Sequence, residues 1–434
     1  MRLFARIRAL AAGKEVRGGS VLVLSSVIAQ IITLVATPVL SRIYEPAAFG
    51  YLTLVVSVTG MIIPAVALRL ESALMLPKDT REASALLFLG LAVAAVISFL
   101  SAATLEILFS TGLLQAMAAL PGFSAWVGGI TFFSGVFVLF GQFALRVRNY
   151  RAVAARNVTQ AATTAVVQLG AALIAPSAFG LVGGYGAGRL AGVVPLVGSV
   201  RAEIRGFDLR DVRRVGREYR AFPLLFAPAA LMNASALALP VLFAGVWYDV
   251  ADAGQWGMAE RILAVPLVIV ATAVSQVVEA RLAHHARSES HGSASYYLRV
   301  STLLLVVSVA VGVAVVVLAP IVVPWVLGPG WEDAALIMQL LTPMLVTRLI
   351  ASPLSKALVV ARWARINFVL DASRLAVVLG VLILCWYRES TVPQLVLATS
   401  IAFAVIYVAT WIAGLAAARH LDRGSALSSV AEEQ

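Results

Sequence analysis

The sequence predicts an all-α polytopic membrane protein with about twelve transmembrane helices arranged in two six-helix lobes. Of its 434 residues, 61% are hydrophobic and 13% are charged, which leaves too little polar surface for a soluble globule of this size. Continuous apolar runs of roughly 20 residues, the length that crosses a bilayer, recur along the chain. These runs do not alternate apolar and polar residues, so they do not fit the strands of a membrane barrel.

Short connections separate the expected spans, and none is long enough for a folded aqueous domain. The basic segment before the first span is interpreted as the flank of an uncleaved helix, because the run that follows exceeds the apolar region of a signal peptide. The expected spans cover residues 21–43, 48–68, 84–109, 124–145, 153–175, 179–200, 221–246, 257–280, 299–327, 334–360, 367–386 and 395–417.

The net charge of +11 is concentrated before the first span and in every second connection. By the positive-inside rule, this pattern predicts a membrane protein with both termini in the cytoplasm. Nucleic acid is not an expected partner, because the cations do not gather in one module. The predicted domains are a basic N-terminal segment 1–20, an N-lobe 21–200, a basic cytoplasmic linker 201–220, a C-lobe 221–417 and a cytoplasmic tail 418–434.

The N-terminal segment alternates cations with apolar residues. This pattern fits a short amphipathic helix on anionic membrane lipids. A basic peptide that only sets the orientation of the first helix fits equally well.

Two motifs of the first half recur in the second half. Tyr44-Glu45 followed by Gly50 returns about 204 residues later as Tyr248-Asp249 followed by Gly254. The polar motif at 146–150 returns at 362–367. Because both matches keep their order, an internal duplication is predicted. Each copy has an even number of spans, so the two lobes should have the same orientation, with a cleft between them.

The sixth span carries glycine at every fourth position. A phosphate-binding glycine loop would follow a strand and space its glycines differently. The pattern instead predicts close helix packing through small residues. The four glycines are Gly180, Gly184, Gly188 and Gly192.

Several arginines lie inside the spans, where a charged side chain at the helix centre costs roughly 2.5–3.5 kcal/mol on insertion scales. Such side chains are expected to face protein or a watery cavity. Arg42 and Arg69 lie near span ends, from which they can also reach the headgroups. Arg348 lies between Pro343 and Pro353, which predicts a bent helix with the cation at the bend. The candidate substrate-binding cations are Arg348, Arg189, Arg261, Arg374, Arg69 and Arg42.

Fewer acids lie in the spans. Asp371 precedes Arg374 by three residues, so the two either neutralise each other or act in function. Uncharged polar residues in spans are more often interhelical hydrogen bonds than ligands. The possible ion-coupling or supporting residues are Glu71, Asp371, Glu260, Gln30, Asn233 and Gln276.

No metal site, cofactor or disulfide is expected. The single cysteine is Cys385, and the four histidines lack the spacing of metal ligands. The surplus of cations over acids in the spans favours an anionic cargo, with phosphate or pyrophosphate matched by guanidinium geometry.

The first two spans resemble polysaccharide biosynthesis proteins of the Wzx type. The resemblance covers roughly residues 20–165. It is carried by Leu40-Ser41-Arg42-Ile43-Tyr44-Glu45-Pro46-Ala47-Ala48-Phe49-Gly50-Tyr51, and by Arg69-Leu70-Glu71 before Leu76-Pro77 and Glu82-Ala83. Arg42, Tyr44, Pro46, Phe49, Gly50, Arg69 and Glu71 are the positions that match the family pattern.

Proteins of this type are lipid-linked oligosaccharide flippases of the multidrug/oligosaccharidyl-lipid/polysaccharide (MOP) exporter superfamily. The resemblance implies two lobes around a cation-lined cavity with alternating access, and no enzymatic activity. It implies an undecaprenyl-pyrophosphate-linked oligosaccharide repeat unit as cargo, for surface polysaccharide such as O-antigen, capsule or exopolysaccharide. Polysaccharide polymerase or export proteins are the implied partners.

Three alternatives stay open. A drug/cation antiporter of the same superfamily would need intramembrane carboxylates, in which this chain is poor. A peptidoglycan-precursor flippase would share the pyrophosphate chemistry. A membrane-embedded glycosyl- or acyltransferase would need a catalytic acid or histidine near the membrane surface, for which Glu279, His284 and His285 form the available cluster.

Overall fold

The structure is a computed structural model that describes residues 14–112, 114–287 and 292–432. The secondary structure in these ranges is helical throughout, which confirms the all-α prediction. Ten helices are long and apolar enough to cross a membrane. Helices α8 (Tyr150–Ile174) and α12 (Val250–Arg287), of 25 and 38 residues, also reach the length of a span. Every predicted span corresponds to a helix or to consecutive helical segments.

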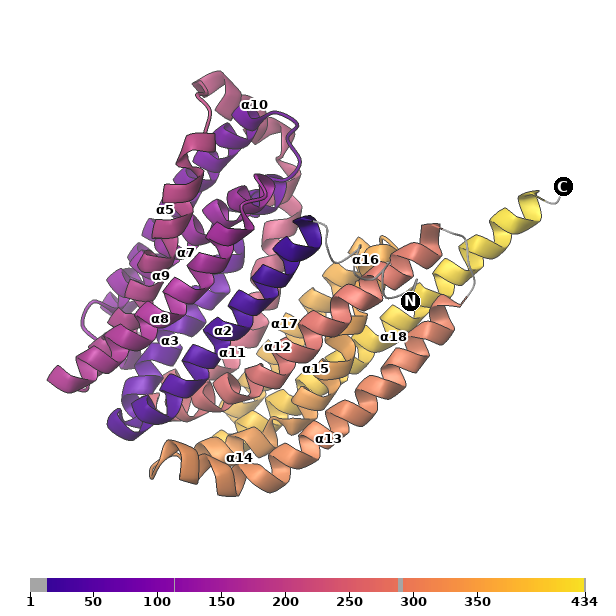
Figure 1. The fold of residues 1–434 in the computed structure, drawn as a ribbon. Coiled ribbons are helices and arrows are strands. Elements are labelled where there is room, and N and C mark those ends of the chain that lie inside the picture. Colours follow the sequence, from indigo (N-terminus) through magenta and orange to yellow (C-terminus); the bar gives the residue numbers. More distant parts are fainter. Residues whose placement is uncertain (1–13, 113, 288–291, 433–434) are drawn as a thin grey trace, which may run out of the picture. The chain divides into compact units, whose positions relative to one another are not determined.

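The chain forms two compact units. Unit 1 contains the residues up to Ala234 together with Gly245–Gly254. Its core lies between the helices of the first half, where Leu86, Leu139 and Phe143 are fully buried. Figure 1 shows these helices side by side, in indigo to magenta. Besides α8, they are α2 (Lys14–Ile43), α3 (Pro46–Ile62), α5 (Thr80–Ser110), α7 (Phe123–Arg146), α9 (Ala178–Val200) and α10 (Leu209–Glu218).

Unit 2 contains residues 235–244 and the chain from Gln255 onward. Its core includes Leu282, Tyr297 and Leu354. Helix α18 (Val392–Glu432) packs against α13 (Ser293–Leu327), α15 (Thr342–Leu354) and α17 (Ala364–Tyr387). Helices α11 (Ala227–Trp247) and α12 contribute segments to both units. The remaining helices of this unit are α14 (Glu332–Leu340) and α16 (Lys356–Val360).

The two copies of the second motif end their helices in the same way, which agrees with the predicted duplication. Arg148 and Arg362 both have a left-handed backbone conformation, with φ of 57° and 59°. In each copy the next amide turns back to a carbonyl five residues earlier. Asn149 N donates to Ala144 O at 2.8 Å, and Trp363 N donates to Leu358 O at 2.9 Å. Such a turn usually takes glycine. A non-glycine residue also makes it at the end of α17, where Glu389 has φ of 49° and Ser390 N donates to Cys385 O at 3.0 Å, so the similarity of the two copies supports the duplication without proving it.

Several predicted boundaries differ from the structure. Helix α2 begins at Lys14 and α18 runs to Glu432, past the predicted start of the tail. The predicted linker contains helix α10. The predicted tenth span is interrupted near its two prolines, and not at Arg348 itself. Arg348 lies inside the continuous helix α15, and the breaks fall at Leu341 and Ser355. The N-terminal segment lies outside the described residues up to residue 13.

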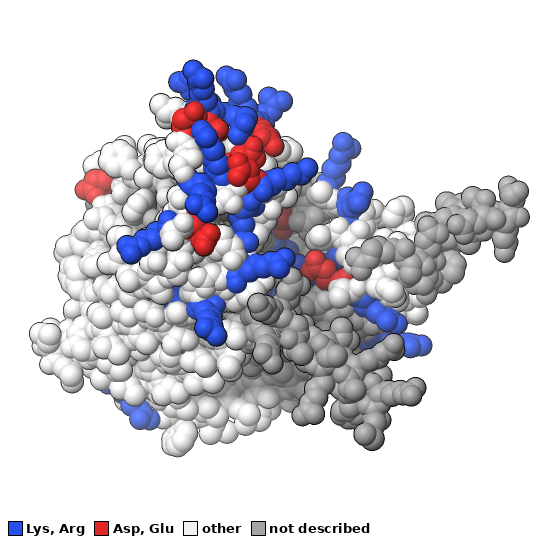
Figure 2. Space-filling view, turned by 45° about the horizontal axis from the view of Figure 1, so that its top comes forward, with Lys and Arg blue, Asp and Glu red and all other residues white. Residues whose placement is uncertain are grey.

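Acidic side chains hold helix α10 against the start of α5. Asp211 accepts a hydrogen bond from Arg81 Nε at 2.7 Å, and Arg214 lies 3.0 Å from Glu82. Val215 is buried in the unit 1 core. Figure 2 shows Lys and Arg gathered over this end of unit 1, while the flank below them is mostly uncharged. This distribution agrees with the predicted cytoplasmic side, and the orientation stays a prediction.

Candidate functional site

Polar side chains follow one face of helix α8 in unit 1. They recur at every fourth position, which places them on one side of a helix. This face packs against the glycines of α9. Thr164 Oγ1 lies against Gly188, and the side chain of Gln168 lies against Gly184. The prediction of close packing through the sixth-span glycines is therefore confirmed. The stripe consists of Arg156, Gln160, Thr164 and Gln168.

Two arginines from different helices meet at one aromatic ring. The guanidinium carbons of Arg156, on α8, and Arg189, on α9, lie 4.1 Å and 5.3 Å from the ring centre of Phe137, on α7. Arg156 also donates to the carbonyl of Phe137 at 3.3 Å. Arg189 donates to the hydroxyl of Tyr185 at 2.9 Å and lies 5.2 Å from that ring. The ring face attracts both cations.

No carboxylate neutralises this arginine pair within the described part of the chain. Neither guanidinium has an acidic oxygen within 4.0 Å. The Arg189 Nε atom is buried and has no hydrogen-bond partner. The two like charges repel each other. Because desolvated cations without counter-ions are unfavourable, this geometry favours an anion that bridges the two groups.

An amide and two hydroxyls extend the site to helix α2. Asn157 Oδ1 accepts from Arg156 Nε at 3.2 Å, and Asn157 Nδ2 donates to the hydroxyls of Ser25 and Ser26 at 3.3 Å each. Four helices, α2, α7, α8 and α9, therefore position one polar cluster inside unit 1. Guanidinium groups with an amide and hydroxyls suit phosphate oxygens, and the flanking rings of Phe137 and Tyr185 provide an apolar wall.

Two predicted cations lie in ion pairs. Arg374 Nη1 lies 3.0 Å from Asp371 Oδ1, and its guanidinium lies 5.3 Å from the ring centre of Tyr407. The two side chains therefore form the ion pair that the neutralising interpretation expects. Arg69 Nη1 lies 3.6 Å from Glu71 Oε1. Arg69 itself has a left-handed backbone conformation and directly precedes the short helix α4 (Leu70–Ala73).

The remaining predicted residues are distributed over both units. In unit 2, Glu260 is exposed, accepts a hydrogen bond from Trp256 Nε1 at 3.1 Å and interacts electrostatically with Arg348. Arg261 follows directly and is half-buried. Arg42 and Gln276 are exposed, whereas Gln30 and Asn233 are half-buried on α2 and α11. Of all the predicted site residues, the structure brings only Arg189 into the arginine pair.

Arg156 was missed as a site residue. It lies only three residues after the predicted start of the fifth span at residue 153, where a cation resembles the basic flank of a span. The fourfold spacing of Arg156, Gln160, Thr164 and Gln168 was the available signal. A polar stripe of this kind on an apolar span indicates a buried polar face.

The fold is that of a multi-pass membrane protein, and it is similar to solved structures of MOP superfamily transporters. A MurJ structure, described as lipid II flippase in an inward closed conformation, has a TM-score of 0.68 and 11% identity over 95% of this chain and 91% of that chain. An inward-facing multidrug resistance MATE family transporter has a TM-score of 0.62 and 11% identity over 93% and 95%. A MOP superfamily transporter from Pyrococcus furiosus, described as having a binding pocket of reverse polarity, has a TM-score of 0.52 and 16% identity over 94% of this chain and 93% of that chain.

The chain belongs to the polysaccharide biosynthesis protein family, whose sequence profile matches residues 39–336. This result confirms the resemblance seen in the first two spans. No curated protein matches the sequence. At identities this low, the structural neighbours establish the fold alone.

Proposed function

We propose that the protein is a flippase that moves an undecaprenyl-pyrophosphate-linked oligosaccharide across the cell inner membrane by alternating access, for surface polysaccharide assembly. The observation that carries this proposal is the arginine pair on Phe137. Arg189 lies in a candidate membrane span, and Arg156 lies in α8, which is also long enough to cross a membrane. Neither has a carboxylate partner among the described residues. A phosphorylated headgroup supplies the missing negative charge, and its lipid tail accounts for a site within the spans.

In this proposal, Arg156 and Arg189 bind the pyrophosphate. Asn157 and the α2 serines bind neighbouring oxygens, and the rings of Phe137 and Tyr185 contact the sugar face or the carbon chain. Arg348 is proposed as a second anion contact in unit 2, where its electrostatic partner is Glu260. Membership of the polysaccharide biosynthesis family supports a glycan as the transported group. Polymerase and export proteins are the proposed partners.

Two alternatives receive less support. A cationic drug would be repelled by the arginine pair, and the acids Asp371 and Glu71 already lie near arginines. A transferase would need Glu279 as a free acid, yet Glu279 lies 3.1 Å from Lys356. A peptidoglycan-precursor flippase uses the same pyrophosphate chemistry, so the choice of cargo must be tested directly.

Substitution of the arginine pair tests the proposed function. Arg156→Ala and Arg189→Ala should each reduce transport of the lipid-linked oligosaccharide in proteoliposomes about 10- to 100-fold, because a charged hydrogen bond contributes about 1.5–3 kcal/mol. Lysine in place of either arginine should retain only part of the activity, because its ammonium group lacks the planar, two-pronged donor geometry of the guanidinium group. The matched control is Arg151→Ala, which removes an exposed arginine from the first turn of the same helix.

The readouts are transport, surface polysaccharide and the amount of folded protein in the membrane. Full transport in both alanine variants would contradict the proposal. Faster transport of a peptidoglycan precursor than of the oligosaccharide would instead establish the alternative cargo.

A further inference from the structure

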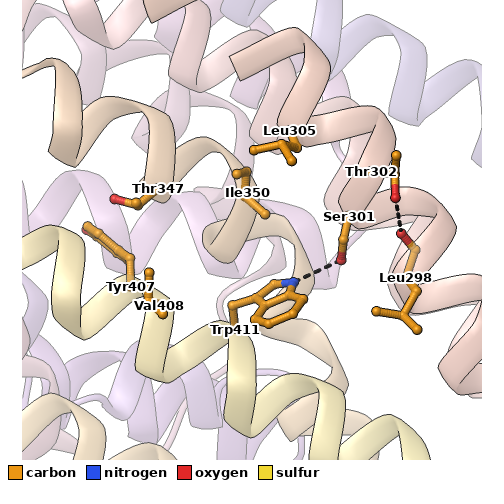
Figure 3. A pocket seen from close by; sticks show the side chains of 9 residues that line it. All are labelled: Leu298, Ser301, Thr302, Leu305, Thr347, Ile350, Tyr407, Val408 and Trp411. Carbon is orange, nitrogen blue, oxygen red and sulfur yellow. Dashed lines mark hydrogen bonds between the residues drawn. The ribbon is translucent and has the colours of Figure 1, made fainter. Parts of the chain in front are cut away.

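A cavity of about 250 Å³ lies within unit 2, between helices α13, α15 and α18. Figure 3 shows Ser301 on α13, Ile350 on α15, and Tyr407 and Trp411 on α18 around it. The cavity belongs to one unit and is separate from the arginine pair of unit 1. Its volume exceeds the roughly 150 Å³ of an engineered apolar cavity that holds benzene. A short stretch of hydrocarbon chain therefore fits.

The aliphatic hydroxyls in the wall are already engaged. Ser301 Oγ donates to the carbonyl of Tyr297 at 2.8 Å and accepts from Trp411 Nε1 at 2.9 Å. Thr302 donates to its own helix at Leu298 O, 3.0 Å away. Thr347 likewise donates to Pro343 O at 2.8 Å. With these groups satisfied, the wall presents methyl groups and rings. A sugar would lose hydrogen bonds to water here without replacing them, whereas a hydrocarbon loses none.

The cavity is continuous with the apolar outer surface of the helices. Three of its lining residues are themselves well exposed, with 41% of Leu298, 48% of Leu305 and 46% of Val408 accessible. Exposed residues of the same type continue along α13 and α18, for example Val309 and Val405. On membrane-spanning helices these residues face lipid. A hydrocarbon chain can therefore enter from the bilayer without crossing a polar region.

We propose that this cavity binds a segment of the isoprenoid chain of the lipid carrier. The proposal rests on the proposed function, because the cargo there is attached to such a chain. Branched side chains and two aromatic rings form the wall, a surface suited to a methyl-branched chain. Tyr407 also packs against the Arg374 guanidinium, so the wall is anchored to the ion pair with Asp371. Binding of the chain would hold the cargo on unit 2 by contacts independent of the sugar.

Photolabelling with a sugar-free probe tests the proposal. The full-length protein in phosphatidylcholine nanodiscs is labelled with a photoreactive polyprenyl phosphate, and the labelled peptides are identified by mass spectrometry. Labels are expected at 298–305 and 407–411, and unlabelled polyprenyl phosphate should displace them. Val408→Trp, which fills the cavity, should reduce this labelling about tenfold, the loss that corresponds to about 1.4 kcal/mol of binding free energy.

The matched control is Val405→Trp, which adds the same ring to an exposed residue outside the cavity. Thermal unfolding verifies that both variants fold. Equal labelling in the two variants, or labels spread over all lipid-facing residues, would overturn the proposal. Labelling of the cavity by a photoreactive phosphatidylcholine, undisplaced by polyprenyl phosphate, would identify an ordinary bilayer lipid as the occupant and overturn it as well.

The outcome is independent of the test of the arginine pair. If Arg156→Ala and Arg189→Ala leave glycan transport intact, the proposed function fails whatever the probe labels. If those variants lose transport but the cavity takes no label, only the isoprenoid site fails.

Discussion

Gly254 lies against the backbone amide of Gly50, so that two equivalent helix starts cross at their glycines. A Cβ atom on Gly254 would lie 2.9 Å from Gly50 N and would also collide with Pro46 O. A Cβ atom on Gly50 would collide with the carbonyl of Val250. Each glycine is the fifth residue after the acid of its Tyr-acid motif. The contact thus pairs the two copies of the repeat and explains why both retain glycine.

Alanine at either glycine should destabilise the protein. Gly50→Ala or Gly254→Ala should lower the free energy of unfolding by about 1–3 kcal/mol, the usual cost of overpacking, because the colliding atoms belong to the backbone and cannot rotate away. The control is Gly60→Ala, on the same helix α3 as Gly50, where no atom lies within 4 Å of the new Cβ. Alanine there should be neutral or stabilising by up to about 1 kcal/mol. Thermal unfolding in detergent measures the difference, and equal Tm values would contradict the steric argument.

The close packing of α9 on α8 should control the arginine pair. Gly188→Ala would collide with Thr164 Oγ1 and approach Gln160 O, so the helices must separate and move Arg189 away from Arg156. Reduced transport is expected at normal protein level. Gly198→Ala, on the same helix with open space around the new Cβ, should leave transport unchanged. Loss of transport in both variants would indicate a general effect on helix α9.

The Asp371–Arg374 pair should be structural. Arg374→Gln leaves a largely buried carboxylate without its cation, which typically costs about 3–5 kcal/mol. The double variant Asp371→Asn/Arg374→Gln should recover most of that stability and the transport activity. Thermal unfolding and transport are measured on the single and double variants. A double variant that is stable but inactive would show that Arg374 contacts the cargo.

The docking of helix α10 should depend on pH only in acid. The backbone amide of Asp208, and then the Arg81 guanidinium, lower the pKa of Asp211 below its ordinary value of 3.8. A carboxyl with a lowered folded-state pKa stabilises the fold above its unfolded-state pKa and loses this effect as the pH falls through the folded-state pKa. Protection of the α10 amides from hydrogen exchange should therefore be constant from about pH 5 to 8 and fall below about pH 4. Asp211→Asn should show weaker protection without this pH dependence.

The local features of the chain could be predicted from the sequence. The length of the apolar runs predicted the spans, because a helix must satisfy its own backbone in lipid. Glycines at every fourth position predicted the packing face of α9. The repeated motifs predicted two helix ends that the structure shows with the same left-handed turn. Arg189 was recognised because a cation in the middle of a span needs a polar environment.

Which side chains from other helices lie next to these residues could not be predicted from the sequence, because it depends on the tertiary structure. Arg156 was not among the predicted site residues, and its position on Phe137 beside Arg189 follows from the packing of α7, α8 and α9. The unit 2 cavity likewise combines side chains from α13, α15 and α18, which lie up to about 110 residues apart. The sequence by itself determined which segments are helical and span the membrane, because backbone hydrogen bonding and apolar length act locally. Only the tertiary structure decided which charges pair and which remain unpaired, because that depends on contacts between helices distant in sequence.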